Sequence, residues 1–218
     1  TFSLGDAGLT NVKVDGPAQW YTHAEIEPSG EVGTTFDLRT QTVNATARTA
    51  FGRLAGALGA QGYFRQYDPQ GDEALTPAAN SDNGGIFLYQ EYPFGAGTNE
   101  ARTPRLQLGG RYDVFRVRSE DSDNPVFGAG RKRTFRNVSG SLGASLPLGS
   151  TMSLSGSVAR AFRAPTVEEL YSNAFHAAVG TFDVGTPTLR AETNRGIDAV
   201  LRAQSGRTYA QFAAYYNR

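Results

Sequence analysis

Residues 136–158 read RNVSGSLGASLPLGSTMSLSGSV, and this stretch decides the fold. In its first half, apolar side chains such as Val138 and Leu142 alternate with asparagine and serine. After a short turn around Pro147, the second half repeats the pattern, with Leu154 and Val158 opposed by serines. Because successive side chains of a strand point to opposite faces, the stretch predicts two antiparallel strands, each with an apolar and a polar face.

The same alternation recurs along most of the chain. It predicts about nine strands, near residues 12–25, 34–47, 54–67, 84–93, 105–118, 135–147, 152–163, 195–203 and 209–218. The first of these is the least regular, because Gly16-Pro17 falls inside it and proline is poorly tolerated away from sheet edges. The Ala-rich residues 49–61 contain three glycines that would each cost a helix ~1 kcal/mol, so we interpret them as a turn leading into a strand. Several strands are about 10–13 residues long, and a tilted strand needs ~9–11 residues to cross a bilayer.

A membrane barrel and a soluble β-sandwich share this alternation, but their connections differ. Tight turns at residues 147–150 and 204–207 alternate with long segments at 68–83, 119–133 and 163–194. Short turns at one end and long loops at the other are typical of outer-membrane barrels, whose short turns face the periplasm. We therefore predict an all-β, antiparallel, up-and-down transmembrane β-barrel. Nine is an odd number, whereas bacterial barrels have even numbers of strands, so either one strand is miscounted or the chain is an incomplete part of a larger barrel.

The composition excludes several classes of protein. The 218 residues contain 21 Lys+Arg and 21 Asp+Glu, a balance that argues against a nucleic-acid partner. Cysteine is absent, which excludes disulfide frameworks, zinc ribbons and thiol catalysis. There is no apolar run of the ~18 residues that a transmembrane helix needs. No grouping of serine, histidine and aspartate has the context of a nucleophile, so we expect no enzyme.

One segment is distinctive enough to indicate a family. Residues 159–202 read ARAFRAPTVEELYSNAFHAAVGTFDVGTPTLRAETNRGIDAVLR. The elements RAFRAP at 160–165, ELY at 169–171 and LRAE at 189–192 resemble those of TonB-dependent outer-membrane receptors. The spacing of YSN at 171–173, His176, GTF at 180–182 and Val184-Gly185 is similar to that of zinc-uptake receptors.

This resemblance implies an incomplete receptor. Family barrels have ~22 strands, follow a plug domain with a TonB box, and end in a strand with a terminal aromatic residue. None of these is visible in the sequence, so residues 1–218 are expected to be a middle-to-late part of the barrel domain, without its plug. The implied location is the outer membrane of a Gram-negative bacterium. The implied partners are outer-membrane lipid, a metal or metal-chelate ligand, and TonB, which acts through the missing plug and TonB box.

The same resemblance makes residues 163–194 the candidate ligand-facing loop. Its candidate binding side chains are Tyr171, Asn173, His176, Glu168, Glu169 and Asp183. An imidazole with carboxylates suits zinc, so His176 is the candidate metal ligand; the alternative is that it packs or hydrogen-bonds within the folded loop. We expect a structural role for Arg160, Arg163, Pro165 and Glu192, with the arginines pairing with loop carboxylates. No cofactor is expected, since zinc or an iron complex would be cargo.

Three functions remain open from the sequence. The first is a TonB-energised receptor that takes up a metal ion or metal chelate. The alternatives are a passive porin-type or adhesin barrel, which needs no plug, and a soluble all-β ligand-binding protein. The basic residues 131–133 lie where a barrel would meet charged lipid; they are compatible with a lipid-phosphate contact or with an ordinary solvated turn.

Overall fold

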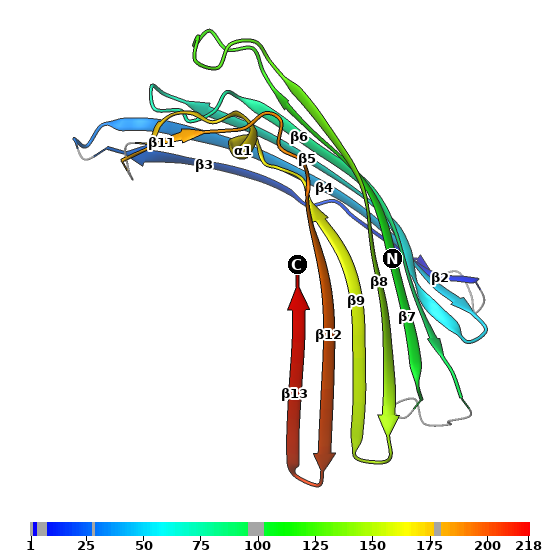
Figure 1. Ribbon diagram of the computed structural model, residues 1–218. Helices are drawn as coiled ribbons and strands as arrows, with labels where there is room; N and C mark the ends of the chain where they lie inside the picture. Colours follow the sequence, from blue (N-terminus) through cyan, green and yellow to red (C-terminus); the bar gives the residue numbers. More distant parts are fainter. Residues whose placement is uncertain (1, 4–7, 28, 96–102, 177–179) are drawn as a thin grey trace.

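The computed structural model describes residues 2–3, 8–27, 29–95, 103–176 and 180–218, which form one large curved sheet (Figure 1). The strands of this sheet are β1 (Phe2–Ser3), β2 (Gly8–Asp15), β3 (Ala18–Ile26), β4 (Val32–Phe51), β5 (Leu54–Gln70), β6 (Ala79–Pro93), β7 (Arg105–Ser119), β8 (Lys132–Leu148), β9 (Met152–Arg163), β12 (Glu192–Ser205) and β13 (Thr208–Asn217). Between β9 and β12 lie a short helix, α1 (Val167–Tyr171), and a hairpin of β10 (Asn173–His176) and β11 (Thr181–Val184).

The sheet has the predicted up-and-down topology. Its order is β1-β2-β4-β5-β6-β7-β8-β9-β12-β13, with β3 also paired to β4, and every pairing is antiparallel. Among the described residues β13 pairs only with β12, so the sheet does not close on itself. In the same part of the chain, no helix is long and apolar enough to cross a membrane.

The strand boundaries depart from the prediction in two places. The expected strand at residues 12–25 is divided at Gly16-Pro17 into β2 and β3, which both pair with β4. Pro17 has no amide hydrogen to donate, but its carbonyl still accepts a hydrogen bond from the Thr42 amide at 3.0 Å. The second departure is the short strand β1, which pairs with β2 and was not predicted, so the sheet contains eleven strands rather than nine. The predicted turn within residues 49–61 is present at Gly52-Arg53, just before β5.

The two ends of the sheet carry different connections. The short-turn end contains the turns at residues 52–53, 149–151 and 206–207, where Gly52 and Gly149 adopt the positive φ values of 59° and 70° that favour glycine. The β6–β7 connection reaches the same end, and its residues 96–102 lie outside the described part. The long-loop end contains residues 71–78, 120–131 and 164–191.

The alternation gives the sheet two faces. On the apolar face, Leu154 lies opposite Leu146 of β8 and Leu201 of β12, and Leu201 lies opposite Phe212 of β13. These side chains project from the sheet with little cover, and Phe212 is 69% exposed. The polar face carries serine, glutamine and charged side chains. An exposed apolar face opposite a polar one is the arrangement of a membrane barrel wall.

Candidate functional site

Residues 164–191, which we call the docked loop, cover the long-loop end of the polar face with their described parts, 164–176 and 180–191. Helix α1 of this loop lies across the strands in Figure 1. Its buried side chains are Val167, Leu170 and Tyr171. They share one apolar cluster with Phe36, Tyr67, Ala79, Val117 and Phe135, which come from β4, β5, β6, β7 and β8. The candidate ligand loop therefore packs against the sheet instead of extending away from it.

Local sequence explains where α1 begins. Thr166 is the N-cap, and its hydroxyl accepts a hydrogen bond from the Glu169 amide at 3.3 Å. The Glu169 carboxylate in turn accepts from the Thr166 amide at 2.8 Å, which completes a capping box. Pro165, buried just before this cap, cannot donate a backbone hydrogen bond. The TVEE sequence thus fixes the direction in which the chain enters the helix.

An ion-pair network fixes the two ends of the docked loop together. Arg163, the last residue of β9, donates to both carboxylate oxygens of Glu169 at 2.7 and 2.8 Å. It also donates to Glu192, the first residue of β12, at 3.0 Å. The hydrogen bonds from Arg163 and the Thr166 amide lower the pKa of Glu169 to about 2. Arg163 therefore pairs with loop carboxylates as the sequence suggested, and Glu169 is engaged in holding the loop.

Arg160 has different partners from those expected. Its Nη1 donates to the side-chain oxygen of Asn137 at 2.7 Å and to the carbonyl of Val138. Neither acceptor is a carboxylate. Arg133, considered for lipid phosphate, donates to the Leu189 carbonyl at 2.8 Å and lies over the ring of Phe135. It therefore also anchors the docked loop.

Two of the candidate binding residues lie at the base of this loop. Tyr171 is 5% exposed, and its hydroxyl has no hydrogen-bond partner among the described residues. This burial raises the pKa of Tyr171. Asn173 connects all three long loops, because its amide nitrogen Nδ2 donates to the Val126 carbonyl at 3.1 Å and its backbone amide to Leu75 at 3.0 Å. A small cavity of about 160 Å³ lies beside both residues.

The remaining candidates are nearer the surface of the loop. His176 and Asp183 lie on adjacent strands of the β10–β11 hairpin, with Nδ1 and Oδ2 3.4 Å apart. Glu168 is half-buried in the first turn of α1. Residues 177–179, between His176 and Asp183, lie outside the described part. Among the described residues, no three histidine or acidic side chains are placed to hold a metal ion, so His176 and Asp183 form a two-donor pair.

A second acidic pair lies near this hairpin and was missed from the sequence. The carboxylate oxygens of Glu27 and Glu73 converge over Gly33, where a Cβ atom would lie 2.5 and 2.7 Å from them. The hydrogen bond that the protonated Glu73 carboxyl donates to Glu27 raises the pKa of Glu73, as do burial and the charges of Glu27 and Glu25, whereas His176 opposes the shift. The two residues are far apart in sequence and lie in the β3–β4 and β5–β6 connections, so only the approach of these two loops brings them together.

Below the docked loop, polar side chains bond to one another across the strands. Arg111 makes a bidentate ion pair with Asp113, with hydrogen bonds of 2.6 and 2.7 Å, and donates to Gln61 at 3.1 Å. Gln61 donates to Asn44 at 2.9 Å, and Asn44 donates to Asp15 at 2.9 Å. The chain of contacts crosses β7, β5, β4 and β2. It gives the polar face a fixed hydrogen-bonding surface.

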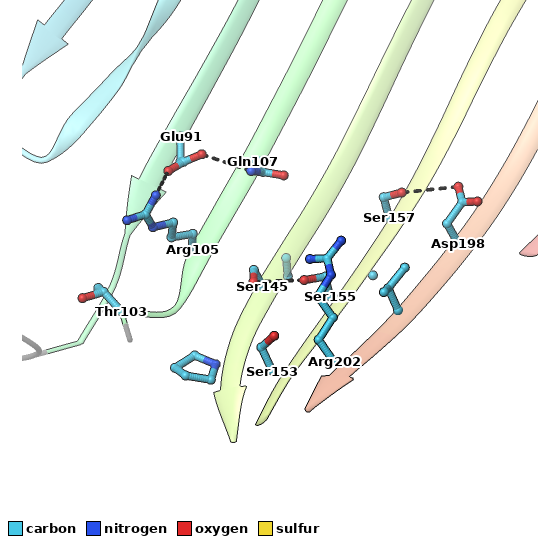
Figure 2. Close-up of a pocket in the computed structure, with 14 residues that line it drawn as sticks. Glu91, Thr103, Arg105, Gln107, Ser145, Ser153, Ser155, Ser157, Asp198 and Arg202 are labelled. Atoms are coloured by element: carbon cyan, nitrogen blue, oxygen red, sulfur yellow. Dashed lines mark hydrogen bonds and ion pairs between the residues drawn. The ribbon is translucent and has the colours of Figure 1, made fainter. Parts of the chain in front are cut away.

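Nearer the short-turn end, the polar face is hollowed into a cavity of about 510 Å³ (Figure 2). On one side Glu91 accepts from Arg105 at 2.8 Å and from Gln107 at 3.0 Å. On the other side Ser157 donates to Asp198 at 3.5 Å. Serines 145, 153 and 155 line the floor between the two sides. The cavity thus offers charges of both signs and many hydroxyls, which suits a polar occupant.

A polar wall, an exposed apolar wall and a long loop folded over one end of the polar side define a section of an outer-membrane-type barrel. The whole chain, residues 1–218, matches the family described as TonB dependent receptor-like, beta-barrel. The protein therefore belongs to the TonB-dependent receptor family. Members of this family are transporters, which confirms that the protein is not an enzyme.

Two solved structures support the fold. The copper transporter OprC matches with a TM-score of 0.78 and 18% identity, over 98% of this chain and 35% of OprC. The Serratia marcescens hemophore receptor HasR, a double mutant in complex with its hemophore HasA and heme, matches with a TM-score of 0.70 and 19% identity, over 84% of this chain and 33% of HasR. The chain thus spans about a third of either structure. No curated protein matches the sequence.

Proposed function

We propose that this chain is part of an outer-membrane receptor that takes up a metal ion or metal chelate and is energised through TonB. Family membership supports the transport class. The observation that carries the proposal is the docked loop, which brings an imidazole, a carboxylate and amide groups over the polar face at the end of the sheet with the long loops. That is where a ligand from outside the cell would first meet a barrel wall.

The choice of a metal cargo rests on donor chemistry. His176 and Asp183 are a nitrogen and an oxygen donor of the kind that zinc accepts, and they are not engaged in the ion-pair network of Arg163. Copper and heme are named for the two similar structures, so metal-containing cargo is the class to test first. Within that class we propose zinc, or alternatively an iron complex, on the basis of the His176 spacing.

The test is an uptake assay with the complete reading frame that contains this chain. A strain lacking the gene is complemented, and uptake of labelled zinc, copper, heme and an iron chelate is measured with and without TonB. We expect uptake of one cargo that is lost when TonB is absent. Uptake that is equal with and without TonB would overturn the proposal and favour a passive barrel. Recovery of the folded protein without detergent would instead indicate a soluble ligand-binding protein.

A variant pair then tests the proposed donor. His176→Ala should weaken binding of the transported metal to the full-length protein by about tenfold, a typical effect of changing groups that support a metal. Thr181→Ala is the matched control, because Thr181 lies opposite His176 in the same hairpin and supplies no imidazole. Equal metal affinity in the two variants would exclude His176 as a ligand.

A further inference from the structure

Three arginines lie in one row at the long-loop edge of the apolar face. Arg160 of β9 lies opposite Arg195 of β12 in the sheet register. Arg195 and Arg218, which follows β13, exchange both backbone hydrogen bonds, at 2.7 and 2.9 Å. Residues opposite one another project to the same face, so the three side chains leave the sheet together. The next row on that face consists of Val158, Ile197 and Tyr216.

The arginine row brings three positive charges together on the apolar face. Like charges directly opposite one another destabilise a sheet. Among the described residues, no carboxylate forms an ion pair with Arg160, Arg195 or Arg218. The acceptors that Arg160 does have, on Asn137 and Val138, are neutral. An anion bound between the guanidinium groups would remove this repulsion.

A groove beside the row gives the shape of such a ligand. It has a volume of about 630 Å³. Its apolar wall is formed by Leu108, Leu142, Val158, Ile197 and Tyr216, and the three arginines lie at one end of it. Gly140 lies opposite Arg160 on β8 and, as a glycine, places no side chain in the groove. A molecule that fills the groove must therefore be apolar along most of its length and anionic at one end.

We propose that this groove binds a membrane lipid that carries a phosphate monoester. Arginine is suited to phosphate, because its planar guanidinium can donate two parallel hydrogen bonds to the phosphate oxygens. The acyl chains would lie along Leu142, Val158 and Ile197, and the phosphate would lie between the arginines. The proposal rests on the outer-membrane location proposed above, but it requires neither a particular cargo nor TonB.

The experiment uses the full-length receptor in detergent micelles, with bound lipid counted by native mass spectrometry. The probes are phosphatidic acid, a diacylglycerol with the same acyl chains, and inorganic phosphate as a competitor. We expect phosphatidic acid to bind and the diacylglycerol not to bind. The double variant Arg160→Gln with Arg195→Gln should lose about a hundredfold in affinity, since it removes two charge-assisted hydrogen-bond donors and the loss of each is expected to weaken binding about tenfold.

Arg207→Gln is the matched control, because Arg207 lies on the β12–β13 turn at the opposite end of the sheet and should bind like the wild type. If the double variant does not fold, Arg195→Gln alone gives the same comparison. The proposal is overturned if the double variant binds phosphatidic acid as tightly as the Arg207 control does. It is also overturned if the diacylglycerol binds equally well, or if inorganic phosphate displaces the lipid, which would indicate a site for a soluble anion. Cargo uptake by the same variants is measured separately, so a failed transport proposal is distinguishable from a failed lipid site.

Discussion

Replacing Glu169 with glutamine should loosen the docked loop while leaving the sheet intact. The wild-type carboxylate receives two hydrogen bonds from Arg163, at 2.7 and 2.8 Å, and one from the Thr166 amide at 2.8 Å. Glutamine has a similar shape but no charge, so it loses the ion pair and weakens the cap. The sheet contacts of β9 and β12 do not involve this side chain.

The expected magnitude follows from the pKa and the exposure. A fall in the pKa of Glu169 from 4.5 to about 2 would correspond to about 3 kcal/mol if the pair were shielded from water. The side chains of Arg163 and Glu169 are 48% and 38% exposed, however, so solvent screens much of that interaction. With the capping contribution included, we expect the docked loop to lose about 1–2 kcal/mol.

Hydrogen exchange of the full-length protein measures this loss directly. The reporting amides are those of Leu170, Ser172 and Thr186, which donate to Thr166, Glu168 and Glu169 carbonyls. Their exchange should become about 5–30-fold faster in Glu169→Gln. Glu168→Gln is the control, because it removes the same charge from the same helical turn, where the helix dipole contributes only about 0.3–1 kcal/mol. Equal exchange rates in the two variants would refute the role assigned to the Arg163–Glu169 pair.

The same residue makes the docking depend on pH with a defined sign. The pKa of Glu169 is lowered in the folded state, so its stabilisation is fully present above the ordinary glutamate pKa. It is lost as the pH falls from about 4.5 towards 2. Amide protection in α1, corrected for intrinsic exchange, should show a step in that window in the wild type. The step should be missing in Glu169→Gln.

Two further predictions concern a buried ion pair and a close backbone contact. Arg111→Gln leaves the Asp113 carboxylate, whose side chain is 5% exposed, without its ion pair, and should lower the free energy of unfolding by about 2–3 kcal/mol in denaturant titrations. Arg116→Gln is the control, because Arg116 pairs with Asp82 and its side chain is 47% exposed; it should lower the free energy of unfolding by less than about 1 kcal/mol. Equal losses of unfolding free energy in the two variants would contradict the importance of burial. Gly185→Ala should release the docked loop, because its Cβ would lie 2.6 Å from the Tyr171 amide, and protease cleavage within residues 164–191 should accelerate. Gly110→Ala is the control, because a Cβ atom there would meet nothing within 4 Å, and it should be cleaved like the wild type. If Gly185→Ala is cleaved no faster than Gly110→Ala, the close approach at Gly185 is unimportant.

The sheet was predictable because its signal is local. Alternation with period two identifies each strand and both of its faces, and the unequal connections identify the two ends. The break at Gly16-Pro17 was visible in the sequence, but its consequence was not. A proline interrupts one partner of β4 without interrupting β4 itself, and only the pairing of both β2 and β3 with one long strand reveals this.

The candidate site was less accessible to sequence reasoning because its contacts are between distant residues. The capping box of TVEE and the pairing of Arg163 with Glu169 are local enough to be expected. The convergence of Glu27 and Glu73 is not, because it depends on how two loops approach each other. Nor does the sequence reveal that Tyr171, a candidate binding side chain, is almost entirely buried.

One signal in the sequence did indicate where the loop docks. The polar face of β7 carries Arg111 and Asp113, but two steps further along the same face the pattern becomes apolar, at Phe115 and Val117. If this face met water along its whole length, its side chains would be expected to stay polar. Val117 is instead completely buried beneath the docked loop. Such a break in the polar face therefore indicates an apolar partner, which here is α1. It also separates the roles of the loop residues, since those beside the break anchor the loop, whereas the proposed donors His176 and Asp183 on the β10–β11 hairpin lie outside this apolar cluster.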